Sequence, residues 1–369
     1  LEARTAELEA NQFSTTTKLN GNAIFSIAGV FADDDALPDN NGNGTLDDDQ
    51  ATFGYRVRMN FNSSFTGDDR LQIRLQSRDT RSFDADPIGF SYGGGNGGDV
   101  RLDNLFYDFP LTSNIDVRIG ANSLSPDDLI TSTISPLDSS TSGSISGFGF
   151  PQQYAIAAPG NAGAGIIVQL ADSLSLDLGY TAANASSPVD GQGLFNGSYS
   201  AIAQLTYLGS SFDAGLMYMR SYTTVGALNA PGSTWDTLGF QGNFRLNDTV
   251  EIGGGAAYVD QDIIGGGDAE FWSYQGTLAL NDLGGEGNLL GVLAGITPYS
   301  RDNIIGVGLL GNTITDPDTS FLAEVFYRIQ VNDRISVTPA IIYIDDPDGG
   351  GGGDFDDSVI GALRTTFSF

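Results

Sequence analysis

The feature that most constrains what this chain can fold into is a strict alternation of apolar with polar or small residues, repeated from position 18 to the C-terminus. In the segment YRVRMNF at positions 55–61, every odd-numbered residue is apolar and every even-numbered residue is polar. Successive side chains of a β-strand point to opposite faces, so this pattern predicts a strand with one apolar face. We predict sixteen such strands, at positions 18–31, 52–64, 70–79, 100–110, 115–122, 162–171, 174–183, 198–208, 212–222, 234–246, 249–259, 269–280, 288–298, 319–331, 334–345 and 358–369.

The connections between these strands alternate in length along the chain. Seven are short, and six of these are turns of Asn, Asp, Gly and Ser, which is typical of β-hairpins. The other eight are long and polar: 32–51, 80–99, 123–161, 184–197, 223–233, 260–268, 299–318 and 346–357. All long loops then lie at one rim and all short turns at the other, as in outer-membrane barrels. We predict an all-β fold, a 16-stranded antiparallel transmembrane β-barrel over residues 15–369. A soluble, secreted β-protein is the alternative, and it gives no reason for this sorting of loops.

The N-terminal residues 1–14, LEARTAELEANQFS, are mainly helix-forming types, with Leu1 and Leu8 seven positions apart. This spacing fits two core positions of a coiled coil, and we predict the end of a helical linker that begins upstream. A solvated helical tail is the alternative. No run of 18 apolar residues is present, so we predict no transmembrane helix.

Composition excludes several classes of function. The chain carries 16 Lys and Arg against 46 Asp and Glu, a formal charge of −30, whereas nucleic-acid binding requires a basic surface. It has no His and no Cys, which removes the commonest general base, thiol chemistry and most zinc sites. Phosphate-binding loops and dinucleotide fingerprints are also absent from the sequence. We therefore expect no nucleic-acid partner and no enzymatic activity.

Arginine placement is the most informative electrostatic feature of the sequence. Half of the 16 cationic residues lie between positions 56 and 118, and several fall on the polar phase of neighbouring strands. On a barrel that phase faces the lumen, and strands about 4.8 Å apart would bring these side chains into one basic patch. The candidate pore-lining arginines are Arg56, Arg58, Arg74, Arg78, Arg101 and Arg118.

The longest loop, 123–161, contains SPDDLI and SPLDSS, which supply Asp127, Asp128 and Asp138. If this loop folds into the lumen, its carboxylates face the arginine wall, and opposite charges across a narrow waist create a transverse field. Two alternatives remain open. In the first, acids on the same wall neutralise the arginines. In the second, the loop is a surface element or a contact between subunits.

The stretch DNNGNGTLDDDQ at 39–50 resembles part of a calcium-binding loop. The ligands would be Asp39, Asn41, Asn43, the Thr45 carbonyl and Asp47, with Gly44 at the sharp turn. The last ligand position holds Gln50 in place of the usual bidentate acid, and no helix pattern flanks the loop. We expect Ca²⁺ as the one candidate cofactor; a solvated acidic loop is the alternative.

Three stretches, LEARTAELEANQFSTTTKLNG, ISVTPAIIYI and the closing LRTTFSF, resemble cyanobacterial outer-membrane porins. These porins are related to the carbohydrate-selective porin family, and many are labelled iron-uptake porins. The C-terminal Phe369 also resembles the aromatic residue by which bacterial outer-membrane barrels are recognised for assembly.

The resemblance implies a homotrimer in the lipid bilayer of the bacterial outer membrane, which passes inorganic ions, iron among them, and small polar solutes by passive diffusion. It also implies a surface-layer-homology domain upstream, and any contact with peptidoglycan or another cell-wall polymer would belong to that domain. The alternative function is structural: a largely plugged barrel that links the outer membrane to the cell wall.

Overall fold

The structure is a computed structural model of the chain, and it describes residues 16–32, 50–83, 88–224, 232–300, 319–347 and 357–369. Almost all regular structure in these ranges is β. The strands are β1 (Thr17–Ala32), β2 (Thr52–Ser63), β3 (Arg70–Thr80), β4 (Gly94–Gly95), β5 (Arg101–Thr112), β6 (Ile115–Asn122), β7 (Ala162–Ala171), β8 (Leu174–Ala182), β9 (Tyr199–Leu208), β10 (Phe212–Thr223), β11 (Ser233–Arg245), β12 (Val250–Ile263), β13 (Asp268–Asn281), β14 (Leu289–Ser300), β15 (Phe321–Asn332), β16 (Ile335–Asp345) and β17 (Ser358–Ser368).

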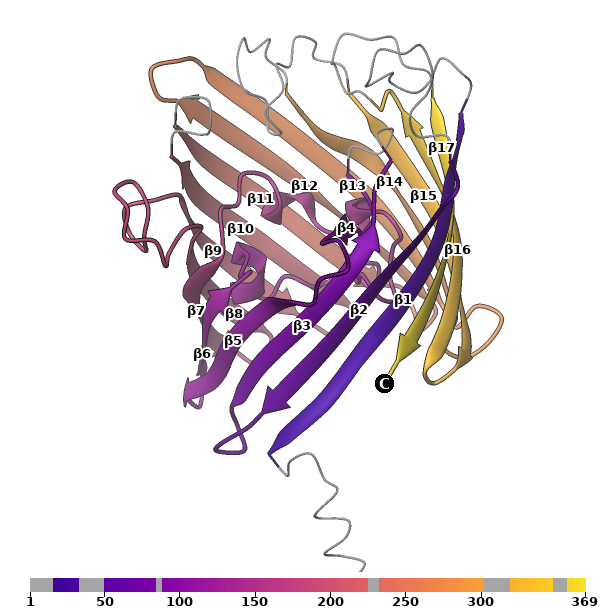
Figure 1. Cartoon of the computed structure of the whole chain (residues 1–369), viewed down its shortest axis with the longest axis horizontal. Coiled ribbons are helices and arrows are strands. Elements are labelled where there is room, and N and C mark those ends of the chain that lie inside the picture. Colours follow the sequence, from indigo (N-terminus) through magenta and orange to yellow (C-terminus); the bar gives the residue numbers. More distant parts are fainter. Residues whose placement is uncertain (1–15, 33–49, 84–87, 225–231, 301–318, 348–356) are drawn as a thin grey trace, which may run out of the picture.

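The strands form one closed antiparallel sheet (Figure 1). Closure comes from β1, which pairs with β2 on one side and with β17 on the other, so that Ile24 lies opposite both Arg56 and Thr366. The two-residue β4 only extends the edge of β3. Sixteen strands therefore make up the wall, and the predicted barrel is confirmed. The predicted strand ends agree with the observed bounds to within two residues, except at the end of β12.

The rims of the barrel differ as the loop lengths predicted. The strand ends that long connections join lie at one end of the barrel, and the short turns lie at the other, where the C-terminus also lies (Figure 1). The predicted helical tail at 1–14 lies outside the described residues. Among the residues that the structure describes, no helix is long and apolar enough to cross a membrane.

The outward face of the wall carries large apolar side chains that remain exposed. Leu238 on β11 is 53% exposed and Ile341 on β16 is 61% exposed. Such positions recur on strand after strand around the barrel, which is the band expected to face lipid. Polar and buried residues occupy the alternate, inward positions.

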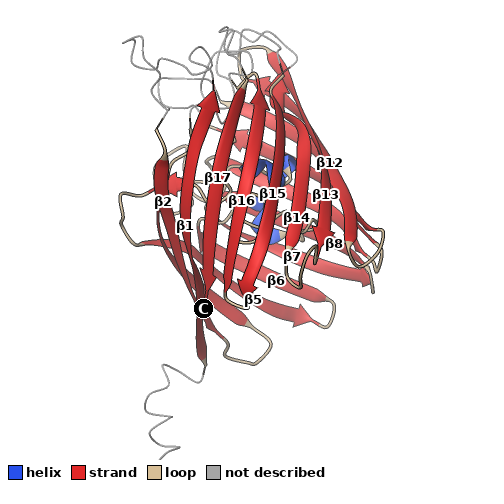
Figure 2. Cartoon of the chain, turned by 90° about the vertical axis from the view of Figure 1, so that its right-hand side faces the viewer, coloured by secondary structure: helices blue, strands red, loops and turns tan. Residues whose placement is uncertain are grey.

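Two long connections fold back into the barrel: the second outer loop, described over residues 81–83 and 88–100, and the third outer loop, residues 123–161. The third outer loop contains three short 3₁₀ helices, η1 (Pro126–Leu129), η2 (Gly147–Gly149) and η3 (Gln152–Tyr154). Figure 2 shows these helices inside the ring of strands. The two loops join each other through a β-bridge between Phe90 and Ser146.

An apolar core fixes both loops to one part of the inner wall. Strands β14–β17 are apolar on their inward as well as their outward phase, as in AIIYI at 340–344. Burial of this apolar surface stabilises the inward position of the loops. The buried cluster joins wall residues Ile24, Leu293, Leu322, Phe326, Ile342 and Ile360 to loop residues Phe83, Phe90, Tyr92, Leu137, Ile145 and Phe148.

Candidate pore constriction

The third outer loop begins its path against the wall formed by β8–β11. The Thr131 amide donates to Oδ2 of Asp177 on β8, at 2.9 Å. Gln204 on β9 donates to the Thr131 carbonyl at 2.7 Å. Gln241 on β11 donates to the Ser132 carbonyl, also at 2.7 Å. Inward polar side chains of the strands thus satisfy backbone groups of a segment that has no regular structure of its own.

The same loop then reaches the opposite wall, which is formed by β15–β17. In the closed ring of strands, these lie about half the strand order away from β9. Arg328 on β15 donates to the Ser142 carbonyl at 2.9 Å, and Arg364 on β17 donates to the Gly143 carbonyl at 2.7 Å. These charged donors bind carbonyls that water would otherwise have to satisfy.

Glu324, four positions before Arg328 on β15, fixes the adjoining residues of the loop. Its carboxylate is fully buried and accepts from the amides of Ile145 at 2.6 Å and Ser146 at 2.9 Å. The Ser146 hydroxyl donates to the same carboxylate at 2.5 Å. Three donors converge on one acid, which orients this part of the loop closely.

The loop returns to the first wall through η3. The Tyr154 hydroxyl donates to Gln204 at 2.5 Å and accepts from Gln241 at 2.6 Å. The hydroxyls of Thr181 and Ser200 both donate to the Pro159 carbonyl. The third outer loop therefore crosses the barrel and comes back, and both of its crossings are held by hydrogen bonds to the wall.

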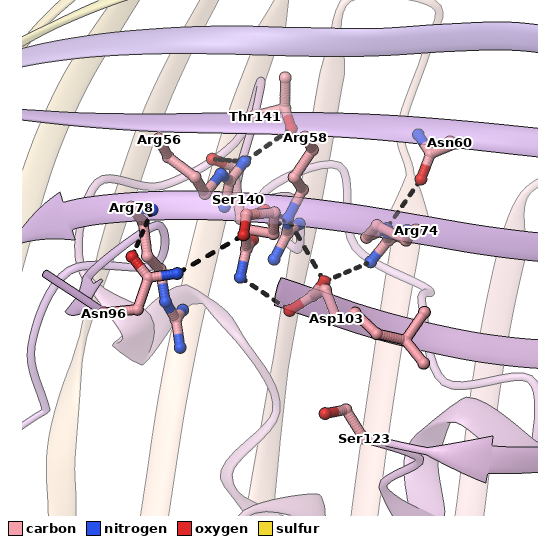
Figure 3. A network of polar contacts seen from close by, with 12 residues as sticks. Arg56, Arg58, Asn60, Arg74, Arg78, Asn96, Asp103, Ser123, Ser140 and Thr141 are labelled. Carbon is pink, nitrogen blue, oxygen red and sulfur yellow. Dashed lines mark hydrogen bonds and ion pairs between the residues drawn. The ribbon is translucent and has the colours of Figure 1, made fainter. Parts of the chain in front are cut away.

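Four of the predicted arginines gather on β2 and β3, and we call Arg56, Arg58, Arg74 and Arg78 the arginine cluster (Figure 3). Asp103 on β5 lies 4.0 Å from Nε of Arg58 and 3.7 Å from Nη1 of Arg74. Asp103 was not among the predicted site residues, although it lies two positions after Arg101 at the start of β5.

Members of the arginine cluster meet the third outer loop at its far crossing. Arg58 donates to the Ser140 hydroxyl at 3.3 Å, and Arg56 donates to the Thr141 hydroxyl at 3.2 Å. We expected Arg56 to line the pore, but its side chain has no exposed surface and lies beneath the loop. The Arg56 side chain points into the barrel as predicted, but there it meets the third outer loop and not open water. Arg78 donates to the Gly93 carbonyl of the second outer loop at 2.6 Å.

Arg118 and Arg101 lie apart from the arginine cluster. Arg118 pairs with Asp108 at 2.6 Å, lies 4.4 Å from the centre of the Phe106 ring, and also donates to the Asp128 carbonyl. A charged cavity of about 370 Å³ adjoins this group, near the short turns. Arg101 is exposed and pairs with Asp99 at 3.4 Å.

The three predicted acids of the loop divide between two roles. Asp128 caps η1 by accepting from the amide and hydroxyl of Ser125, at 2.9 and 3.0 Å. Asp127 and Asp138 line a second cavity of about 400 Å³ together with Phe150 and Tyr154. That cavity lies within the third outer loop itself, because residues of this loop alone line it.

Burial sets the protonation of these two carboxyls. Burial, with a smaller contribution from Asp128, raises the pKa of Asp127 to about 6. Burial, with a smaller contribution from Asp127, raises the pKa of Asp138 to about 7. Both groups therefore change charge across the pH range around neutrality.

The predicted site residues did not include three inward charges of the last strands: Glu324, Arg328 and Arg364. The signal was present, because a charge inside an otherwise apolar strand such as FLAEVFYRI marks an inward position that needs a partner. Their partners lie more than 170 positions away in the chain, at Ser142–Ser146, so pattern alone could not name them.

The predicted calcium ligands Asp39, Asn41, Asn43, Thr45 and Asp47 lie outside the described residues. Within the ranges that the structure does describe, no group of three or more Asp or Glu side chains is arranged to hold a metal ion.

A closed barrel with an apolar outer band and a long polar loop fixed across its lumen is the architecture of the outer-membrane porins. The chain matches the carbohydrate-selective porin, OprB family, over residues 1–369, and it belongs to this family. It is therefore a channel-type protein of the bacterial outer membrane.

Two similar curated proteins, both described as uncharacterized, come from cyanobacteria. The one from Synechocystis sp. is 32% identical over 413 aligned positions, and the alignment covers 100% of this chain and 72% of that protein. The one from Nostoc sp. is 33% identical over 417 positions, covering 100% of this chain and 68% of that protein.

Solved porin structures share the fold. OprB of Pseudomonas putida has a TM-score of 0.64 at 13% identity, covering 100% of this chain and 96% of that chain. An anion-selective porin from Comamonas acidovorans has a TM-score of 0.66 at 13% identity, covering 96% of this chain and 99% of that chain. At such low identity the likeness concerns the fold alone.

Proposed function

We propose that the protein is a porin through which inorganic ions and small polar solutes diffuse passively, past a constriction built from the third outer loop. The observation that carries the proposal is the double crossing of this loop, fixed by hydrogen bonds to β8–β11 and to β15–β17. A loop held in this way narrows a barrel to a passage of fixed charge and shape.

The charges around the constriction support selection by electrostatics. The arginine cluster lies on β2 and β3, while Asp127 and Asp138 line the cavity within the loop. Basic and acidic groups on different sides of a narrow lumen orient polar solutes and discriminate among ions. The family description adds carbohydrates to the solute classes worth testing.

Conductance and solute flux test this proposal directly. Purified protein reconstituted in planar bilayers should give discrete current steps in potassium chloride. Proteoliposomes should swell at rates that fall as sugars become larger. Protein that inserts as a folded barrel but carries no current and no sugar would overturn the proposal.

A second function, a largely plugged barrel that serves as a structural link in the envelope, is favoured by one observation. The buried apolar cluster fills the lumen between β14–β17, β1 and the two inward loops. This function predicts a current no higher than that of a bare lipid bilayer, together with retention of the protein on isolated cell wall. The current steps described above discriminate between the two functions.

Three finer proposals follow, the first two from the family resemblance and the third from the residues of the first outer loop. Iron is among the ions proposed to pass, and Fe²⁺ should quench calcein trapped in proteoliposomes faster than in protein-free vesicles. The protein is proposed to be a homotrimer, which light scattering of the detergent complex measures. Ca²⁺ is proposed to bind at 39–47, and calorimetry should show binding that Asp39→Asn weakens.

A further inference from the structure

We propose that the arginine cluster is a binding station for a small oxyanion, a phosphoryl or carboxylate group, on the wall of the pore. The inference rests on the proposed channel function and adds a solute class to it. Three observations lead to it: an excess of positive charge, unpaired buried donors, and partial exposure to the lumen.

The first observation is the charge balance. Arg364 on β17 lies close enough to Arg56 for the two to repel each other, as do the other three members of the arginine cluster. Among the described residues, Asp103 is the one acid whose carboxylate lies within 4.0 Å of the cluster. Glu324 is the acid whose charge acts on Arg364, and it already accepts from loop amides. Asp128 of the third outer loop also attracts Arg58. Five cations therefore face three carboxylates, an excess of two positive charges.

The second observation is the state of the Arg56 guanidinium. It is fully buried, and only its Nη2 donates, to Thr141 and to the Ser140 carbonyl at 3.4 Å. Its Nε and Nη1 have no hydrogen-bond partner among the described residues, and neither has Nε of Arg364. A buried charge with unpaired donors is costly unless an opposite charge or an acceptor satisfies it. An oxyanion supplies both.

The third observation concerns access and geometry. The side chains of Arg58 and Arg74 are 20% and 27% exposed, so the arginine cluster opens to the lumen. The planar guanidinium fork matches two oxygens of a phosphate or carboxylate, and the nearby hydroxyls of Ser140 and Thr141 add neutral donors. A neutral sugar would leave the charge excess uncompensated, and a metal cation would increase it. The arrangement therefore favours small oxyanions over both.

Single-channel recording tests the station. Open channels in potassium chloride receive inorganic phosphate on one side, and in a separate arm acetate. We expect the current to decrease saturably as the anion concentration rises. If the station takes only phosphoryl groups, phosphate alone will decrease the current. If it also accepts carboxylates, acetate will decrease the current as well. Arg58→Gln and Arg78→Gln should each weaken the apparent affinity about tenfold, the usual loss for one charge-assisted contact. Arg334→Gln, at an exposed short turn, is the matched control and should behave like the native protein.

A second measurement needs no variant. Phosphate should raise the unfolding temperature of the native barrel in detergent above that in chloride at equal ionic strength, because a ligand stabilises the state that binds it. Channels that conduct but are blocked by neither anion, with no change in unfolding temperature, would overturn the station and leave the proposed function intact. The absence of any channel would instead contradict the proposed function.

Discussion

At the scale of single residues, burial decides what each charge in the lumen does. Arg56 and Arg364 have no exposed surface, and both donate to the backbone of the third outer loop. Arg58 and Arg74 keep part of their surface exposed. The same residue type on the same phase therefore anchors a loop at one position and stays partly exposed at another. Arginine suits both tasks because it stays charged when partly buried.

Ion preference should depend on pH through Asp127 and Asp138. Their pKa values are raised to about 6 and about 7, so both carboxyls are largely neutral at pH 5 and ionised at pH 8. Cations should therefore be preferred more strongly as the pH rises between these values, as reversal potentials in a salt gradient will show. In the double variant Asp127→Asn, Asp138→Asn, this rise should disappear. A native channel whose selectivity is the same at both pH values would contradict the assignment.

A charged substitution on the outward face should destabilise the barrel. Leu238 is half exposed near the middle of β11, where we expect hydrocarbon. Leu238→Arg should destabilise the barrel by about 2–4 kcal/mol if this position lies at the bilayer midplane. Urea unfolding of the protein refolded into lipid vesicles measures this free energy, with Leu238→Ala as the control for lost apolar contact. Equal stability of the two variants would show that the position does not face lipid.

At the scale of elements, the third outer loop depends on anchors that lie far away in the chain. Glu324 on β15 accepts from two loop amides and one loop hydroxyl. Glu324→Ala should leave these buried donors unpaired, at a cost of roughly 1–3 kcal/mol for each. We expect faster proteolysis within the loop and noisier, larger channel currents.

Glu251 offers a matched control for this experiment. It is another strand carboxylate, and it binds Asn243 and Asn281 of the neighbouring strands, at 2.5 and 2.7 Å, and not the loop. Glu251→Ala should leave loop proteolysis unchanged. If both variants speed proteolysis equally, the effect reflects general loosening of the barrel and not a specific anchor.

The elements also show what the sequence could predict. Alternation and loop length predicted all sixteen strands and their closure, because the period of two acts locally on every strand. They also placed Arg58 and Arg74 on the inward phase. The packing of the two inward loops on the apolar wall of β14–β17 and the partners of Glu324 could not be predicted. They depend on where a loop without periodicity packs, and that is settled by contacts between distant parts of the chain.

At the scale of the whole molecule, the barrel combines two kinds of interior. On the side of β14–β17, an apolar core holds the inward loops in place. On the side of β2 and β3, the arginine cluster and Asp103 leave charged groups partly open to water. We infer that the first fixes the constriction and the second acts on what passes it.

The proposed channel function requires that a passage remains beside or through the anchored loop. Single-channel recording of the native protein across a potassium chloride gradient tests it most directly. We expect discrete, reproducible conductance steps with a non-zero reversal potential, since charged groups line the lumen. Folded, inserted protein that never raises the current above that of the bare bilayer would contradict it.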